Sequence, residues 1–200
     1  KVQKTYDYPV YFKNATEEQR PEDGTQVSLW ATNLSQSINP FWVILLTPVV
    51  LAFFSFLRLR NAEPSTPAKV AFGLLISGLS VLVMVAAVKA GSNGTEKVSP
   101  WWLVANYGVI TIGELFLSPM GLSLVSKLSP ASITSLMMGG WFLATSIGNK
   151  LSGVLASMWD SYNDKTDFFW VNFGLLLGAT ALMFLLLGRL NKTMNEKGIH

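Results

Sequence analysis

A glutamate in the middle of an apolar segment is the residue of this sequence best suited to do chemistry. At about 100° per residue, a helix would place three further polar side chains within a sector of about 60° that includes Glu114, namely Tyr107, Thr111 and Ser118. An ionisable group at mid-membrane is costly and marks a functional site by default. This polar stripe must therefore face protein or a water-filled cavity rather than lipid.

The residues leave two roles open for Glu114. It could handle substrate or protons on a transport pathway, or it could be a buried side chain that only hydrogen-bonds a neighbouring helix. We favour the first role, because a carboxylate is a costly way to join two helices. Burial and nearby cations act on a carboxylate in opposite directions, so its charge could change during a transport cycle.

A second polar stripe lies further along the chain. Trp141, Thr145, Asn149 and Ser152 fall within about 80° on a helical wheel. The ring of Trp141 could bound an apolar side-chain pocket or meet an ammonium group. Spacing alone equally allows a tryptophan that faces lipid or packs on a helix. Lys150 projects to the opposite side, and we interpret it as reaching the membrane interface.

Asn39 is a donor and an acceptor at the start of another apolar run. Pro40 follows it, and proline is common in the first turn of a helix. From the residues alone, the favoured interpretation of Asn39 is therefore a helix cap.

These side chains occur in apolar runs that are long enough to cross a bilayer, which takes about 20 residues of helix. The runs cover residues 38–57, 68–90, 101–125, 133–158 and 167–188. Lys69, Lys89 and Asp167 lie at their ends, and Glu114 and Lys150 are the charges in their interiors. We expect an all-α membrane protein with five transmembrane helices. A soluble bundle is disfavoured because too little chain remains to cover these runs.

Composition excludes several classes of protein. The 200 residues are 50% hydrophobic and 14% charged, whereas soluble chains carry about 25% charged residues. With no cysteine and one histidine, His200, we expect no disulfide scaffold, metal site or histidine-based triad. No phosphate-binding loop or paired carboxylates suggest an enzyme. A net charge of +3 without a basic stripe argues against nucleic acid as a partner.

Lysine and arginine are distributed unequally between the connecting segments. Lys97 and Lys165 lie on one side, and the other side collects Arg58, Arg60, Lys69, Lys127, Arg189, Lys192 and Lys197. The excess of positive charge predicts the cytoplasmic side. We therefore expect residues 1–37 to be an extracytoplasmic loop or tail and residues 189–200 to be a cytoplasmic tail, in a multi-pass protein of the cytoplasmic membrane.

Several segments resemble one transporter family. Residues 113–130, GELFLSPMGLSLVSKLSP, resemble the tenth transmembrane helix of the proton-dependent oligopeptide transporters, which belong to the major facilitator superfamily. Residues 36–48 (QSINPFWVILLTP), 69–86 and 138–153 (MGGWFLATSIGNKLSG) resemble the eighth, ninth and eleventh helices, and 171–190 fits the twelfth. The resemblance implies the C-terminal bundle of a major-facilitator fold, comprising helices 8–12, within a longer protein.

The resemblance also implies roles for individual residues. In the family, the glutamate matching Glu114 helps to hold the peptide amino terminus and takes part in proton coupling, and the serine matching Ser118 lines the cavity. The residues matching Asn39 and Trp141 contact the peptide and form part of a side-chain pocket. For Asn39 this role replaces the cap interpretation, although the two can coexist. Further cavity-lining candidates are Tyr107, Thr111, Thr145 and Asn149.

The function that the resemblance implies is proton-coupled symport of di- and tripeptides by alternating access. Protons would be the coupling ion and no other cofactor is expected. The expected partners are the peptide, the lipid bilayer and the N-terminal bundle of the same protein. The alternatives are a major-facilitator transporter of another small solute, and a non-transporting membrane subunit in which Glu114 is structural.

Overall fold

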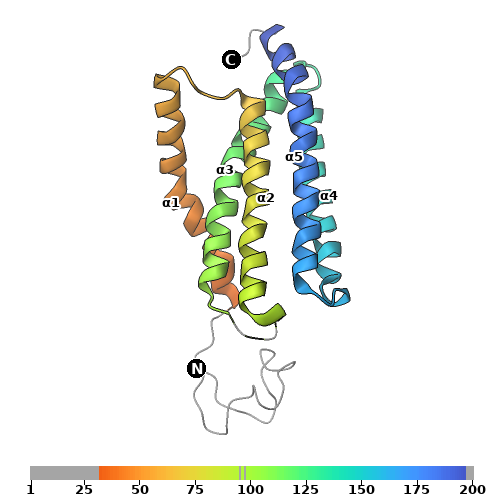
Figure 1. Ribbon diagram of the computed structural model, residues 1–200. Helices are drawn as coiled ribbons and strands as arrows, with labels where there is room; N and C mark the ends of the chain where they lie inside the picture. Colours follow the sequence, from red (N-terminus) through yellow and green to blue (C-terminus); the bar gives the residue numbers. More distant parts are fainter. Residues whose placement is uncertain (1–31, 95, 97, 197–200) are drawn as a thin grey trace. The chain divides into compact units, whose positions relative to one another are not determined.

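The computed structural model describes residues 32–94, 96 and 98–196. Helices make up most of this part of the chain, and no strand occurs in it: α1 (Thr32–Leu59), α2 (Thr66–Ala90), η3 (Ser92–Gly94), α3 (Trp101–Leu128), α4 (Thr134–Ser157), η4 (Trp159–Ser161) and α5 (Lys165–Glu196) (Figure 1). The expected all-α fold class is confirmed. The chain divides into two units, Lys1–Ile38 and Asn39–His200, and the packing described below lies within the second unit.

Two helix boundaries differ from the sequence-based expectation. α1 begins at Thr32, so Pro40 lies inside the helix and the interpretation of Asn39 as a cap is wrong. No glycine or proline interrupts residues 32–39, so the helix continues through the Asn39-Pro40 pair that resembles a helix start. α5 continues to Glu196 because no helix-breaking residue follows Gly188 until Gly198. Residues 1–31 and 197–200 of the two expected flanking segments lie outside the described residues.

Among the described helices, α1, α2, α3 and α5 are long and apolar enough to cross a membrane. The mean hydropathy of their most apolar stretches runs from 1.6 in α3 to 2.5 in α2. α4 is not in this group, because its sequence mixes apolar residues with glycine, serine, threonine, Asn149 and Lys150. Membrane crossing by α4 therefore stays a prediction.

The helix α2 packs along both α3 and α5. Its closest approach to α3 is made possible by Gly73 and Gly113, since a Cβ atom at Gly73 would lie 2.9 Å from the Gly113 carbonyl oxygen. Small residues allow membrane helices to approach closely when lipid provides no hydrophobic force between them. α2 therefore fixes the position of α3, and it also packs along α5.

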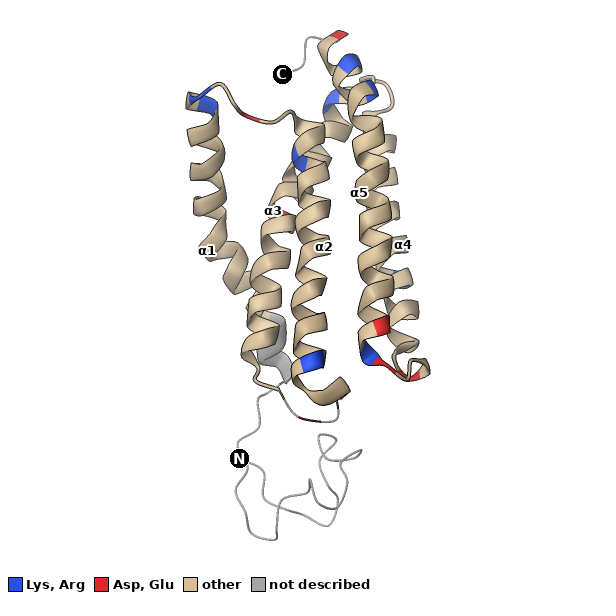
Figure 2. Cartoon of the chain, in the orientation of Figure 1, with Lys and Arg blue, Asp and Glu red and all other residues tan. Residues whose placement is uncertain are grey.

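The other two helices are more loosely attached. α1 meets α3 through a small buried cluster of Val50, Phe54 and Phe116, in which the two phenylalanine rings lie 4.7 Å apart. α4 has no fully buried residue. Figure 2 shows that lysine and arginine gather near the ends of the helices. Apolar faces between charged ends are suited to lipid or to further helices.

Candidate functional site

The centre of the candidate site is a hydrogen bond between an amide and a carboxylate. Asn39 Nδ2 on α1 donates to Glu114 Oε2 on α3 at 2.8 Å, across 75 positions of sequence. Both side chains are half-buried. Hydrogen bonds to ionised groups are stronger than those between neutral groups. Oε1 of Glu114 has no hydrogen-bond partner within the described part of the chain, so the carboxylate can accept a further donor.

The part of α1 that carries Asn39 and Trp42 is held against α3 by Trp42. Its indole Nε1 donates to the Val104 carbonyl oxygen at 3.0 Å, and its ring lies against Gly108, where a Cβ would come within 3.3 Å of it. Residues three apart share a helix face, so Trp42 and Asn39 point in similar directions. Trp42 therefore positions Asn39 against Glu114. Sequence reasoning missed this tryptophan, and its three-residue spacing from Asn39 was the available signal.

Figure 1 shows that α1 changes direction along its length. Pro48 lies inside the helix and cannot donate a backbone hydrogen bond to Ile44, which is a common cause of a kink. The Thr47 hydroxyl bonds the Val43 carbonyl oxygen at 2.5 Å in the same turn. The two arms of α1 then meet α3 separately, one through Trp42 and the other through Phe54.

The side chains of the polar stripe on α3 differ in how exposed they are. Glu114 and Tyr107 are half-buried and Ser118 is exposed. Thr111 differs, because its side chain has no exposed surface and its Oγ1 lacks a hydrogen-bond partner among the described residues. Thr111 therefore contributes to helix packing in this chain, and a cavity-lining role for it stays a prediction.

Trp141 of α4 lies against the face of α3 that carries Glu114. Its ring occupies the space beside Gly121, where a Cβ atom would overlap it. Gly121 follows Glu114 by seven positions, so it lies on the same face of the helix about 10 Å further along. Sequence reasoning missed Gly121, and nothing in the spacing alone points to it.

The remaining candidates of α4 do not contact Glu114 in the described structure. Thr145 is exposed, and its hydroxyl donates to the Trp141 carbonyl oxygen at 3.0 Å within the helix. Asn149 is exposed as well. Their predicted place on a transport pathway depends on what faces α4 in the complete protein.

The amide–carboxylate pair lies on an open face. The structure has a cavity of about 880 Å³ between the ends of α1, α2, α3 and α5, and another of about 520 Å³ between α2, α3, α4 and α5. Neither of these two is lined by Asn39, Glu114, Ser118 or Trp141. An enclosed ligand site needs walls on several sides. In the described bundle, neither of the two cavities encloses the amide–carboxylate pair.

A half-buried carboxylate in the middle of a helix bundle of this kind is typical of membrane transporters. The sequence model of the POT family matches residues 30–171, which is more than half of the chain. The chain therefore belongs to the POT family.

Named relatives agree with this assignment. The chain is 32% identical over 149 residues to the uncharacterized transporter YclF of Bacillus subtilis, which covers 74% of this chain and 30% of that protein. It is 36% identical over 133 residues to the dipeptide and tripeptide permease A of Escherichia coli, covering 66% of this chain and 26% of the permease. The chain thus spans less than a third of the length of these relatives.

Solved structures show the same fold. A crystal structure of the peptide transporter POT in complex with sulfate matches with a TM-score of 0.69 and 32% identity, covering 79% of this chain and 31% of that one. A POT family transporter in complex with a thioalcohol-conjugated peptide matches with a TM-score of 0.69 and 27% identity. The match covers 82% of this chain and 34% of that transporter chain. These neighbours are transporters rather than enzymes, as expected from the sequence.

Proposed function

We propose that this chain is the C-terminal part of a transporter that couples proton movement to the uptake of di- and tripeptides. The proposal is supported by membership of the POT family and by relatives that are named as dipeptide and tripeptide permeases. The five helices correspond to helices 8–12, and the upstream bundle supplies the second wall of the site. Alternating access would proceed by rocking the two bundles around this site.

The observation that carries the proposal is the hydrogen bond from Asn39 Nδ2 to Glu114 Oε2. A peptide ammonium group can bind the free Oε1, and a proton can compete for the same carboxylate. In this way one side chain couples the two ligands. No cofactor other than the proton takes part.

The geometry also suits a short peptide. Trp141 lies about 10 Å along α3 from Glu114, as judged from the rise of a helix. Extended chain covers about 3.3–3.6 Å per residue, so this span corresponds to roughly three residues. An amino terminus at Glu114 and a side chain against Trp141 would fit a di- or tripeptide.

We further propose that the site lies in the cytoplasmic membrane with the C-terminus in the cytoplasm. The lysine and arginine excess at the end where α1, α3 and α5 terminate supports this orientation. The segment 1–37 would then be extracytoplasmic.

The test is Glu114→Gln in the complete transporter. The change keeps the size of the side chain and its ability to hydrogen-bond Asn39, but it cannot bind a proton at neutral pH. Accumulation of labelled dipeptide driven by a proton gradient should be abolished, while the amount of protein in the membrane stays the same.

Glu196→Gln is the matched control, because Glu196 is exposed at the end of α5 and far in sequence from the site. Normal accumulation by Glu114→Gln would contradict the proposal. Inhibition by sugars or nitrate but not by unlabelled peptides would identify a transporter of another solute.

A further inference from the structure

The larger cavity lies away from the amide–carboxylate pair and has a strongly basic lining. It measures about 880 Å³ and opens where α1, α3 and α5 end and α2 begins. Arg58, Lys69 and Lys127 line it, and Glu63 is the one acidic residue of the lining. We call it the basic cavity. Its volume lies within the range of about 300–1,000 Å³ that ligand sites occupy.

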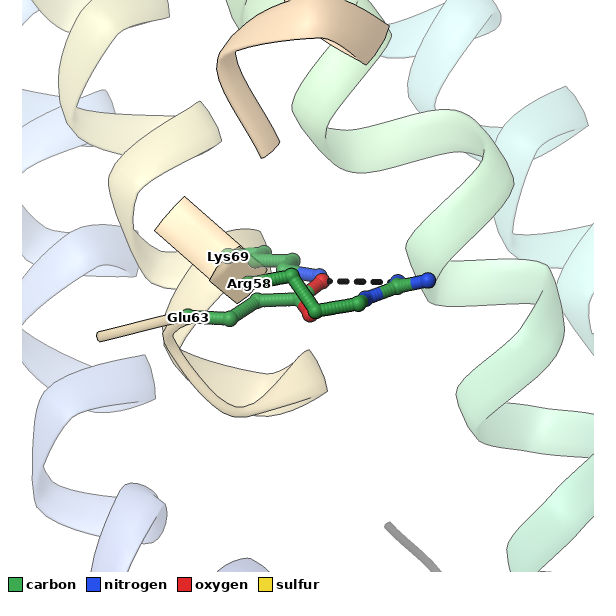
Figure 3. A network of polar contacts seen from close by, with 3 residues as sticks. All are labelled: Arg58, Glu63 and Lys69. Atoms are coloured by element: carbon green, nitrogen blue, oxygen red, sulfur yellow. Dashed lines mark hydrogen bonds and ion pairs between the residues drawn. The ribbon is translucent and has the colours of Figure 1, made fainter. Parts of the chain in front are cut away.

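Two of the three cations are fixed in place by one carboxylate. Arg58 Nε donates to Glu63 Oε2 at 2.7 Å, and Lys69 Nζ is ion-paired with Glu63 Oε1 (Figure 3). Lys69 is buried, with 7% of its side chain exposed, and its ammonium lies 4.5 Å from the centre of the Phe54 ring. One carboxylate is therefore paired with two cations, so the three residues together carry a net positive charge.

The third cation and the helix end add to this positive potential. Lys127 has no ion-pair partner within the described residues and projects from the last turn of α3. The first turn of α2 has no acidic residue, and its cap Ser65 makes no side-chain capping bond. The N-terminus of a helix carries partial positive charge. Together these groups are suited to an anion.

We propose that the basic cavity binds the phosphate headgroup of an anionic phospholipid. Basic pockets between the ends of transmembrane helices are suited to such headgroups. The lining also includes Met120 and Met194, which are apolar. Phe56 and Leu59 are exposed beside Arg58, with 49% and 82% of their surfaces accessible, and can contact the acyl chains. The proposal requires a chain that spans a membrane but does not depend on which solute is transported.

The test measures lipid binding to the purified complete transporter by native mass spectrometry. Phosphatidylglycerol and phosphatidylcholine with the same acyl chains are titrated separately. Phosphatidylglycerol should bind more tightly. Lys127→Gln should weaken its binding about fivefold, which corresponds to about 1 kcal/mol for one basic residue near the membrane surface. Lys127 is suitable because its removal leaves no carboxylate unpaired.

Lys192→Gln is the matched control. Lys192 lies near the C-terminal end of α5, as Lys127 does in α3, and it is exposed and does not line the basic cavity. It should leave phosphatidylglycerol binding unchanged. Equal binding of the two lipids, or equal losses in both variants, would overturn the proposal. Displacement of the lipid by equimolar inorganic phosphate would instead identify a site for a soluble anion. Normal peptide uptake alongside any of these results would leave the proposed transport function intact.

Discussion

At the scale of single residues, the hydrogen-bond partner of Glu114 is a neutral amide. Asn39 donates to one carboxylate oxygen and brings no charge of its own. In the function proposed above, a neutral donor leaves the carboxylate available to both a proton and a substrate cation. A lysine or arginine at this place would compete with both ligands. The choice of an amide is therefore consistent with a site that must bind and release positive charge.

Asn39→Asp tests this role directly. The substitution would place two carboxyl groups within hydrogen-bonding distance, and like charges so close cannot both remain ionised. The pair should retain one proton, so the pH profile of peptide uptake should shift towards alkaline pH. Asn61→Asp, in the exposed loop after α1, adds the same charge and should leave the profile unchanged. Identical profiles for Asn39→Asp and the unsubstituted transporter would argue against the pair.

At the scale of helices, the contact of α4 with α3 depends on one missing side chain. Gly121→Ala would introduce a Cβ into the space of the Trp141 ring. Overpacking of this kind costs about 1–3 kcal/mol, so the thermal unfolding midpoint of the purified transporter should fall. The KM for dipeptides with bulky side chains should also change, because the ring must move. Gly178→Ala on α5 is the control, since no atom lies within 4 Å of its Cβ position. Its unfolding midpoint should be equal to or higher than that of the unsubstituted transporter. Equal midpoints for the two variants would refute the contact.

The helices illustrate how far sequence reasoning reaches. Run length predicted five helices, and all five are present. Four of them are long and apolar enough to span a membrane, whereas the crossing by α4 stays a prediction. Helical spacing placed Glu114 and Ser118 on one face of a helix, and their roles stay predictions. The start of α1 was predicted wrongly, because an asparagine before a proline has the same local pattern at a helix start and inside a kinked helix. Trp42 and Gly121 matter because of contacts between helices. The spacing of residues within one helix does not predict such contacts.

At the scale of the whole molecule, the ion-pair network of Arg58, Glu63 and Lys69 lies apart from the Asn39–Glu114 pair. Hydrogen bonds from Arg58 and Lys69 lower the pKa of Glu63 from 4.5 to about 2. Because its pKa is lowered in the folded state, Glu63 contributes stability fully above pH 4.5 and loses it as the pH falls towards 2. Between pH 5 and 8 the Glu63 carboxylate therefore stays ionised.

Glu63→Gln should lower the thermal unfolding midpoint by a constant amount between pH 5 and 8, because the carboxylate is ionised throughout this range. Below pH 4.5 the difference from the unsubstituted transporter should shrink. Thermal unfolding across a pH series measures the constant difference between pH 5 and 8 and its decrease below pH 4.5. A difference that grows on acidification would contradict the charge assignment.

The distance in sequence between Asn39 and Glu114 has a consequence for biogenesis. The asparagine leaves the ribosome 75 residues ahead of the glutamate, so it enters the bilayer without its partner. An unpaired amide in hydrocarbon costs far less than an unpaired carboxylate. In this order of synthesis the neutral group precedes the charged group, so the hydrogen-bond donor for Glu114 already exists when α3 emerges.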